Sequence, residues 1–162
     1  MKKAIIESRD EKPTAGWKKI LAPTDFSERS QEAVKAATNL AEQCGAKITL
    51  LHVVQFPALG CPETELAVDE VINSSFDCLS KIANGISTEL INGKLVRLSE
   101  QGIEREIIET ARDISADLIV IATHGHSQLE RALLGSTAEK VVRHAPCPVL
   151  VARTKEDFSK AN

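Results

Sequence analysis

The sequence predicts an α/β domain built on a parallel sheet with helices on both faces. Three observations predict it: five short apolar segments with the character of strands, apolar residues at helical spacing between them, and glycines and prolines near the junctions. Strands that alternate with helices along a chain pair in parallel and are joined by right-handed crossovers. The 162 residues are enough for one such domain with a buried core.

Both ends of the chain are expected to lie outside this domain. Residues 1–16 are polar, include Pro13 and Gly16, and favour a flexible N-terminal extension. The tail from residue 154 to residue 162 is also polar. The expected domain therefore spans residues 17–153.

The first strand is expected at Ile20–Ala22, where Pro23 ends it and turn residues follow. Ser27 is expected to cap a helix whose apolar face recurs every three or four residues and ends before Gly45. Ile48–Val54 is a nearly continuous apolar run, which is typical of a strand covered on both faces.

The middle of the chain shows a less regular pattern. Residues 56–62 contain two prolines and a glycine and are expected to form a loop. A weak helical pattern covers Glu65–Ile82, and Lys94–Leu98 alternates like an edge strand. Apolar residues from Ile103 to Ile114 then predict a helix with a clear apolar stripe.

The last third repeats the alternation. Leu118–Ala122 is the most apolar predicted strand and is expected to lie centrally, with a polar turn after it. Ser136 is expected to cap the last helix, and Val149–Ala152 follows two prolines as the last strand. Ligands of open parallel sheets bind beyond the carboxyl ends of the strands, where the strand order reverses. The expected place for a site is therefore after Ala22, Val54 and Ala122.

Composition and charge exclude several functions. The net charge of -3, with Lys and Arg spread along the chain, argues against nucleic-acid binding. No apolar run approaches the roughly 20 residues of a membrane span, and the N-terminus does not resemble a signal peptide, so a cytoplasmic protein is expected.

The cysteines and two of the histidines are expected to have structural roles. The irregular spacing of the cysteines argues against a zinc or redox site and favours reduced thiols, with Cys61 as an exposed thiol the alternative. His52 lies in a strand and His144 at a helix end, where structural roles are expected. The cysteines are Cys44, Cys61, Cys78 and Cys147.

The segment around Gly125, Gly135 and Ser136 has the composition of an anion site. Backbone N–H groups and a hydroxyl converge there at the positive end of a helix. Glycine lets the backbone approach a phosphate, and turns of this kind often need a positive φ. Two glycines at this spacing also fit plain connectors between a strand and a helix, so the pattern alone leaves both readings open.

Two stretches of the chain resemble the universal stress protein family. LIVIATHGHSQLERALLGSTAEKVVRHAPCPVLV from Leu118 is similar to the family's nucleotide loop, and KKILAPTDFSERSQEAV from Lys18 is similar to its first strand and turn. The resemblance covers Lys18 to Arg153. It implies a Rossmann-like fold of the adenine nucleotide alpha hydrolase type, with five parallel strands in the order 3-2-1-4-5.

The resemblance also implies an adenine-nucleotide site for ATP, with Mg²⁺. ATP-binding members carry Gly, two residues, Gly, nine residues, and Gly followed by Ser or Thr. The last two glycines match as Gly125 and Gly135, whereas Ala122 stands in place of the first. Asp25 is implied near the adenine or ribose and the metal, and Val53 near the adenine through its backbone. The implied binding residues are Pro23, Thr24, Asp25, Val53, Ala122, Thr123, His124, Gly125, His126, Arg131, Gly135, Ser136 and Thr137.

Each of these residues also has a plainer interpretation. Asp25 fits a carboxylate at a helix start, and Val53 fits a core position. His124 and His126 fit a solvated turn and make a poor metal site without a third ligand. Arg131 fits either a phosphate contact or an exposed arginine. The sequence predicts neither a catalytic residue nor a dedicated metal site.

The implied function is a nucleotide-binding stress-response or regulatory protein that acts as a homodimer. The resemblance implies pairing through the last strand, at Val149, Leu150 and Val151, and leaves protein partners unidentified. No catalytic motif or Walker lysine is present, so at most slow ATP hydrolysis is expected. Two alternatives stay open: a dimeric interaction module without nucleotide, which Ala122 favours, and an enzyme that cleaves ATP and transfers its adenylyl group.

Overall fold

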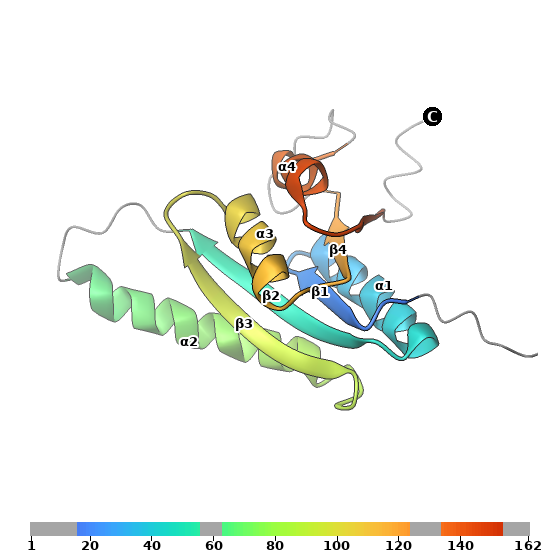
Figure 1. The fold of residues 1–162 in the computed structure, drawn as a ribbon. Helices are drawn as coiled ribbons and strands as arrows, with labels where there is room; N and C mark the ends of the chain where they lie inside the picture. The colour runs from blue at the N-terminus through green and yellow to red at the C-terminus, as the bar shows by residue number, and fades with distance from the viewer. Residues whose placement is uncertain (1–15, 56–62, 124–133, 154–162) are drawn as a thin grey trace, which may run out of the picture.

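The computed structural model describes residues 16–55, 63–123 and 134–153, and within Glu63–Ala67 it describes the backbone alone. Strands and helices alternate along these segments (Figure 1). The elements are β1 (Lys19–Pro23), α1 (Glu28–Cys44), β2 (Lys47–Gln55), α2 (Glu63–Ala83), β3 (Ile91–Ser99), α3 (Ile103–Asp113), β4 (Leu118–Ala122), α4 (Ser136–His144) and β5 (Val149–Ala152).

The five strands form one parallel sheet in the order β3-β2-β1-β4-β5. This confirms the predicted fold and strand order. Ile20 of β1 pairs with Ile48 of β2 on one side and with Leu118 of β4 on the other. The chain order therefore reverses between β1 and β4, where ligands of such sheets bind.

Helices cover both faces of the sheet (Figure 1). Neighbouring residues of a strand point to opposite faces. Ile20 accordingly packs with Val34 and Leu79 on the face of α1 and α2, whereas Leu21 packs with Ile107 and Val141 on the face of α3 and α4. All six side chains are at most 3% exposed. Burial on both faces explains why the inner strands are almost continuously apolar.

The ends of α1 follow the predicted chemistry. The Ser27 hydroxyl accepts a hydrogen bond from the Ser30 backbone N–H, as an N-cap does, and Gly45 follows the helix with φ 69°. A left-handed conformation at this position suits glycine because it has no Cβ.

The start of α4 differs from the prediction. The N-cap is Gly135, and Ser136 is the first helical residue, so the prediction that Ser136 caps the helix is wrong. Gly135 has φ -67° and ψ 154°, an extended conformation that any residue can adopt. The backbone at this position therefore does not require glycine.

The remaining boundaries differ from the predicted ones by a few residues. The helix expected at Glu65–Ile82 runs from Glu63 to Ala83, and the strand expected at Lys94–Leu98 extends over Ile91–Ser99 at the sheet edge.

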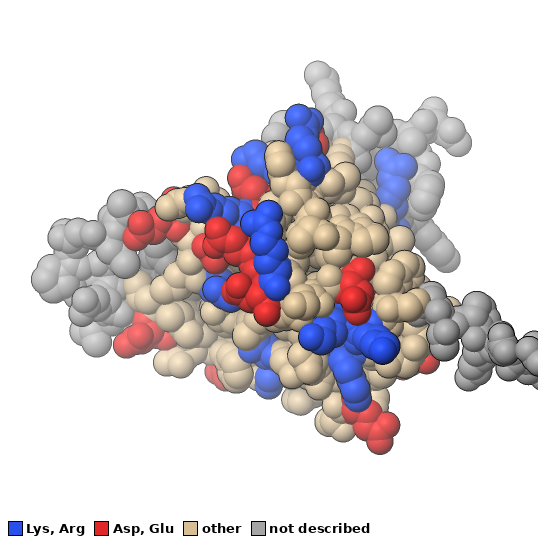
Figure 2. Space-filling view, in the orientation of Figure 1, with Lys and Arg blue, Asp and Glu red and all other residues tan. Residues whose placement is uncertain are grey.

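The visible face of the molecule carries intermixed acidic and basic side chains (Figure 2). Within the described segments, no helix is long and apolar enough to cross a membrane.

Candidate functional site

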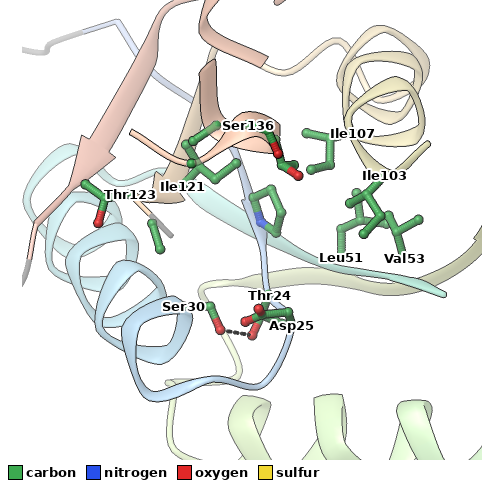
Figure 3. Close-up of a pocket in the computed structure, with 15 residues that line it drawn as sticks. Thr24, Asp25, Ser30, Leu51, Val53, Ile103, Ile107, Ile121, Thr123 and Ser136 are labelled. Atoms are coloured by element: carbon green, nitrogen blue, oxygen red, sulfur yellow. Dashed lines mark hydrogen bonds between the residues drawn. The ribbon is translucent and has the colours of Figure 1, made fainter. Parts of the chain in front are cut away.

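A cavity of about 330 Å³ opens at the carboxyl ends of β1, β2 and β4 (Figure 3). It lies where the strand order reverses, which is the predicted place for a site. Figure 3 shows Thr24 and Asp25 on one side and Ser136 on the opposite side. The lining residues are Pro23, Thr24, Asp25, Ser30, Leu51, Val53, Ile103, Ile107, Ile121, Ala122, Thr123, Gly135, Ser136, Thr137 and Ala138.

Every predicted site residue that the structure describes lines this cavity. These residues come from three separate stretches of the chain: the β1 end, the β2 end, and the segments on either side of residues 124–133. They are Pro23, Thr24, Asp25, Val53, Ala122, Thr123, Gly135, Ser136 and Thr137. The other predicted residues, His124, Gly125, His126 and Arg131, lie outside the described residues, as does Cys61.

The turn between β1 and α1 contains a chain of hydrogen bonds. The Ser30 hydroxyl donates its hydrogen to the Ser27 carbonyl at 2.9 Å, so in the 2.9 Å contact between the Thr24 and Ser30 hydroxyls Thr24 is the donor. The Thr24 hydroxyl oxygen in turn accepts a hydrogen bond from the Phe26 N–H at 3.0 Å. Hydrogen bonds that follow one another in this way strengthen each other, and they hold the turn in one shape.

The same turn positions the Asp25 side chain. The Asp25 Oδ1 atom accepts hydrogen bonds from the Ser27 N–H at 3.1 Å and from the Ser27 hydroxyl at 2.5 Å. The carboxylate is thus held at the cavity wall by the residue that also caps α1. These local hydrogen bonds do not exclude a contact with a ligand, because a carboxylate has about four acceptor sites.

Phe26 adopts a backbone conformation that bulky residues rarely take. Its φ is 68°, in the left-handed region, which costs roughly 1 to 3 kcal/mol for such a residue. The Phe26 ring stacks on the His52 ring of β2 at a centroid distance of 4.1 Å. The Thr24 carbonyl accepts from His52 Nδ1 at 2.8 Å, so Nδ1 carries a hydrogen. His52 thus has the structural role expected of it, and it fastens the turn to β2.

Five apolar side chains line another part of the described cavity wall. Leu51 and Val53 come from β2, Ile103 and Ile107 from α3, and Ile121 from β4. Val53 is 8% exposed and Ile107 is 2% exposed. Of these five residues, only Val53 was predicted from the sequence to be a binding residue. The apolar stripe of α3 was visible in the sequence, but nothing in it showed that the first turn of α3 lies at the cavity end of the sheet.

The start of α4 forms the polar end of the cavity. Gly135, Ser136, Thr137 and Ala138 line it, and the Gly135 N–H donates to the Thr123 carbonyl at 2.7 Å. Within the described residues, no side chain caps this helix. The first N–H groups of a helix lack partners within it and carry its partial positive charge, so this end of the cavity favours an anion.

Among the residues that the structure describes, neither a metal-ligand cluster nor a cysteine lies at this cavity. Among the described residues, no group of three or more His, Cys, Asp and Glu is placed to hold a metal ion. Cys44, Cys78 and Cys147 are half-buried free thiols. Burial raises the pKa of the Cys147 thiol, and the Asp117 carboxylate raises it further, which keeps this thiol protonated.

Comparison with known proteins identifies a family. The model of the universal stress protein family matches residues 16–153. A universal stress protein of Methanocaldococcus jannaschii is 37% identical over 148 residues, which are 85% of this chain and 82% of the relative. The solved structure of the universal stress protein UspA from Lactobacillus plantarum superposes with a TM-score of 0.71 at 28% identity, over 85% of this chain and 98% of that chain.

Two more distant solved structures share the fold and hold adenine nucleotides. A universal stress protein in complex with cAMP has a TM-score of 0.62 at 21% identity, over 86% of this chain and 98% of that chain. The universal stress protein from Archaeoglobus fulgidus in complex with dAMP has a TM-score of 0.62 at 22% identity, over 85% and 98%. The fold, the family match over most of the chain and the 37% identical relative agree: this chain belongs to the universal stress protein family.

Proposed function

We propose that this protein binds an adenine nucleotide in the cavity at the carboxyl ends of β1, β2 and β4. One observation carries the proposal: a single cavity joins an apolar slot to a helix N-terminus. A base needs the first and a phosphate needs the second. The volume of about 330 Å³ is within the range of small-molecule sites.

The wall residues suggest how the nucleotide is oriented. The base lies between Val53 and Ile107, and the phosphates lie at the start of α4, near the Ser136 hydroxyl. The ribose then lies beside Asp25, whose carboxylate accepts hydrogen bonds from sugar hydroxyls. The relatives that hold cAMP and dAMP support this class of ligand.

The proposed ligand is ATP with Mg²⁺. Mg²⁺ is usually held by one or two carboxylates together with substrate phosphates and water. Asp25 is the carboxylate of the described cavity wall, so it fits an ion that arrives with the phosphates and not a metal site of the protein alone. Binding, followed by slow hydrolysis, would then regulate the surface that partners contact.

Ala122 is the residue on which this proposal depends most. It is 7% exposed and lines the cavity at the end of β4. Its methyl group occupies space that glycine would leave to the ligand. Alanine is the smallest side chain that could stand there, so we propose that the site still accepts a nucleotide.

The test is to extract nucleotide from the purified protein and to titrate the emptied protein with ATP and Mg²⁺. Gly135→Leu should weaken binding at least tenfold, because its side chain would stand at the phosphate end of the cavity. Gly16→Leu is the matched control, since a Cβ at Gly16 has no heavy atom within 4 Å. A wild type that stays empty at millimolar ATP would leave only the interaction module, and an adenylated product would favour the enzyme.

We propose further that the protein forms a homodimer through β5. This strand is at the sheet edge, and its outer ladder of N–H and C=O groups has no strand beside it within the described residues. Leu150 is 39% exposed, and Val149 and Val151 are half-buried. An apolar edge strand promotes pairing with another chain. Leu150→Lys should shift the mass measured by light scattering from two chains to one.

A further inference from the structure

A second cavity, of about 380 Å³, lies next to the proposed nucleotide cavity. The two cavities share Ile103, Ser136 and Thr137 as lining residues, so they meet at the first turn of α4. The first cavity is mainly apolar, whereas the second is lined mainly by polar and charged side chains. A ligand that passes the start of α4 would therefore enter a different chemical environment.

Hydrogen-bond acceptors dominate the second cavity. Gln55 at the end of β2 contributes a carboxamide, the β3–α3 connection contributes Glu100 and Gln101, and α3 contributes Glu104. Among the lining residues that the structure describes, Lys140 of α4 is the one cation. This described lining thus contains two carboxylates against one ammonium group, which disfavours further phosphate and favours groups that donate hydrogen bonds.

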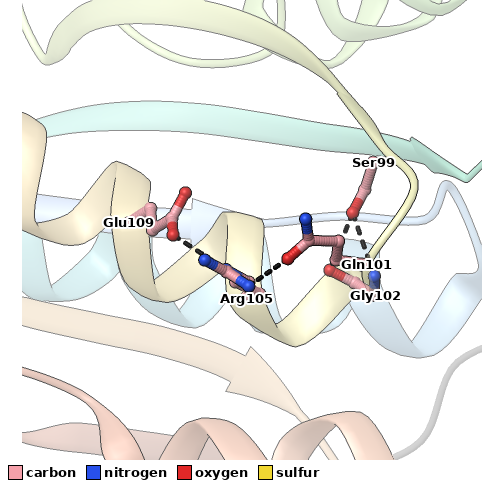
Figure 4. A network of polar contacts seen from close by, with 5 residues as sticks. All are labelled: Ser99, Gln101, Gly102, Arg105 and Glu109. Atoms are coloured by element: carbon pink, nitrogen blue, oxygen red, sulfur yellow. Dashed lines mark hydrogen bonds and ion pairs between the residues drawn. The ribbon is translucent and has the colours of Figure 1, made fainter.

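The connection between β3 and α3 is held in place by its own hydrogen bonds (Figure 4). The Ser99 hydroxyl donates to the Gly102 carbonyl at 2.9 Å and accepts from the Gly102 N–H at 3.1 Å. Arg105 donates to the Gln101 side-chain oxygen and, at 3.0 Å, to Glu109. The Gln101 carboxamide is therefore oriented before any ligand arrives, with its NH₂ group turned away from Arg105.

Glu104 is the best-defined acceptor of this cavity. Its Oε1 atom accepts from Lys140 Nζ at 2.7 Å, and its side chain is 21% exposed. The hydrogen bond from Lys140 lowers the pKa of Glu104, so the carboxylate is ionised at neutral pH. Both carboxylate oxygens lie over Gly102, 3.0 Å from where a Cβ would stand, and Gly102 has φ 121°. Glycine at this position therefore lets the carboxylate approach the backbone.

We propose that the second cavity binds the sugar of a nucleoside diphosphate sugar whose adenosine part occupies the first cavity. This inference rests on the proposed function. The diphosphate would cross at the first turn of α4, where the two cavities meet. The sugar hydroxyls would then donate to Glu104 and bond to Gln101, in the way that a carboxylate commonly binds ribose hydroxyls in dinucleotide sites.

The test compares the affinities of ADP-glucose and ADP for the full chain by calorimetry, without added metal. We expect ADP-glucose to bind about tenfold more tightly than ADP, the effect of one good hydrogen bond to a charged group. Glu104→Gln should remove most of that preference and leave ADP affinity within about twofold. Glu139→Gln on α4 is the matched control, because it also breaks a surface ion pair, with Arg143, and lies outside both cavities.

The outcomes separate this inference from the proposed function. If ADP binds but ADP-glucose binds no better, or if Glu104→Gln weakens both equally, the second cavity is not a sugar site and the nucleotide site stands. If neither ADP nor ADP-glucose binds but ATP with Mg²⁺ does, this inference is wrong and the nucleotide site stands; if ATP with Mg²⁺ also fails to bind, both proposals are wrong. Excess AMP that displaces ADP-glucose would show that the two ligands share the adenosine site, and failure of AMP to compete would overturn the shared placement.

Discussion

The two polar walls of the proposed nucleotide cavity are built in opposite ways. On one side, the Thr24–Ser30 turn is closed by hydrogen bonds of its own and is fastened to β2 by His52. On the other side, α4 begins at Gly135, and within the described residues neither Ser136 nor Thr137 uses its hydroxyl in a hydrogen bond. The first wall, which we call the closed wall, is organised by the protein alone. The second, the open wall, keeps hydrogen-bond donors available. This difference separates residues that maintain the fold from residues proposed to contact a ligand.

The largest effect is expected from Thr24→Val. The substitution keeps the shape of the side chain, but it removes the hydroxyl that donates to Ser30 and accepts from the Phe26 N–H. Thr24 and Ser30 are 5% and 4% exposed, so the Ser30 hydroxyl oxygen would be buried without this donor and the half-buried Phe26 N–H would lose its acceptor, at a cost of about 1 to 3 kcal/mol. The urea midpoint should fall accordingly. Thr24→Ser, which retains the hydroxyl, is the control, and equal losses in both variants would mean that packing alone matters here.

A slightly smaller loss is expected from His52→Ala. This change removes both the stack on Phe26 and the hydrogen bond to the Thr24 carbonyl, together worth about 1 to 2 kcal/mol. His52→Phe keeps the stack and should lose about half as much. His144→Ala, at the exposed end of α4, should change the unfolding free energy by less than about 0.5 kcal/mol. Comparable losses at His52 and His144 would show that the turn does not depend on β2.

The two walls also differ in how far the sequence predicts them. Ser27 as a helix cap follows from local chemistry, because a hydroxyl before a helix satisfies its first N–H groups. The positive φ of Phe26 has no local signature, since it is stabilised by His52, more than twenty residues away in the sequence. The glycine at position 135 suggested a left-handed turn that the structure does not have. A glycine permits such a turn but does not require one, and here the backbone is extended.

Distance along the chain explains what else could not be predicted. The strand order came from the family resemblance and not from periodicity, because any alternation of strands and helices allows several orders. The second cavity brings Gln55, Glu104 and Lys140 together from three elements. Each looks like an ordinary surface residue in the sequence, and only the packing of α3 against both β2 and α4 makes them neighbours.

The open wall should respond to Ser136→Ala in the opposite manner to the closed wall. Because its hydroxyl has no partner among the described residues, its loss should change the unfolding free energy by less than about 0.5 kcal/mol. Nucleotide affinity should fall about tenfold, the effect of one hydrogen bond to a phosphate. Calorimetry with ATP and urea unfolding of the same sample measure both. A variant that unfolds more easily but binds normally would reverse the proposed division between the walls.

The smallest effect is expected at the ion pair between Glu104 and Lys140, which joins α3 to α4 beside the open wall. Both side chains are partly exposed, so the pair should contribute about 0.2 to 1 kcal/mol to the unfolding free energy. Because the pKa of Glu104 is lowered in the folded protein, this stabilisation is present above the unfolded value of about 4.5 and is lost as the pH falls through the folded value. Glu104→Gln should therefore be less stable than the wild type at pH 7, and the difference should shrink towards pH 3. High salt should reduce it as well, because partly exposed charges are screened. A stability difference that stayed constant from pH 7 to pH 3 would assign the loss of stability to the packing of Glu104 over Gly102. The contact between α3 and α4 would then belong with the closed wall, as a part of the fold that needs no ligand.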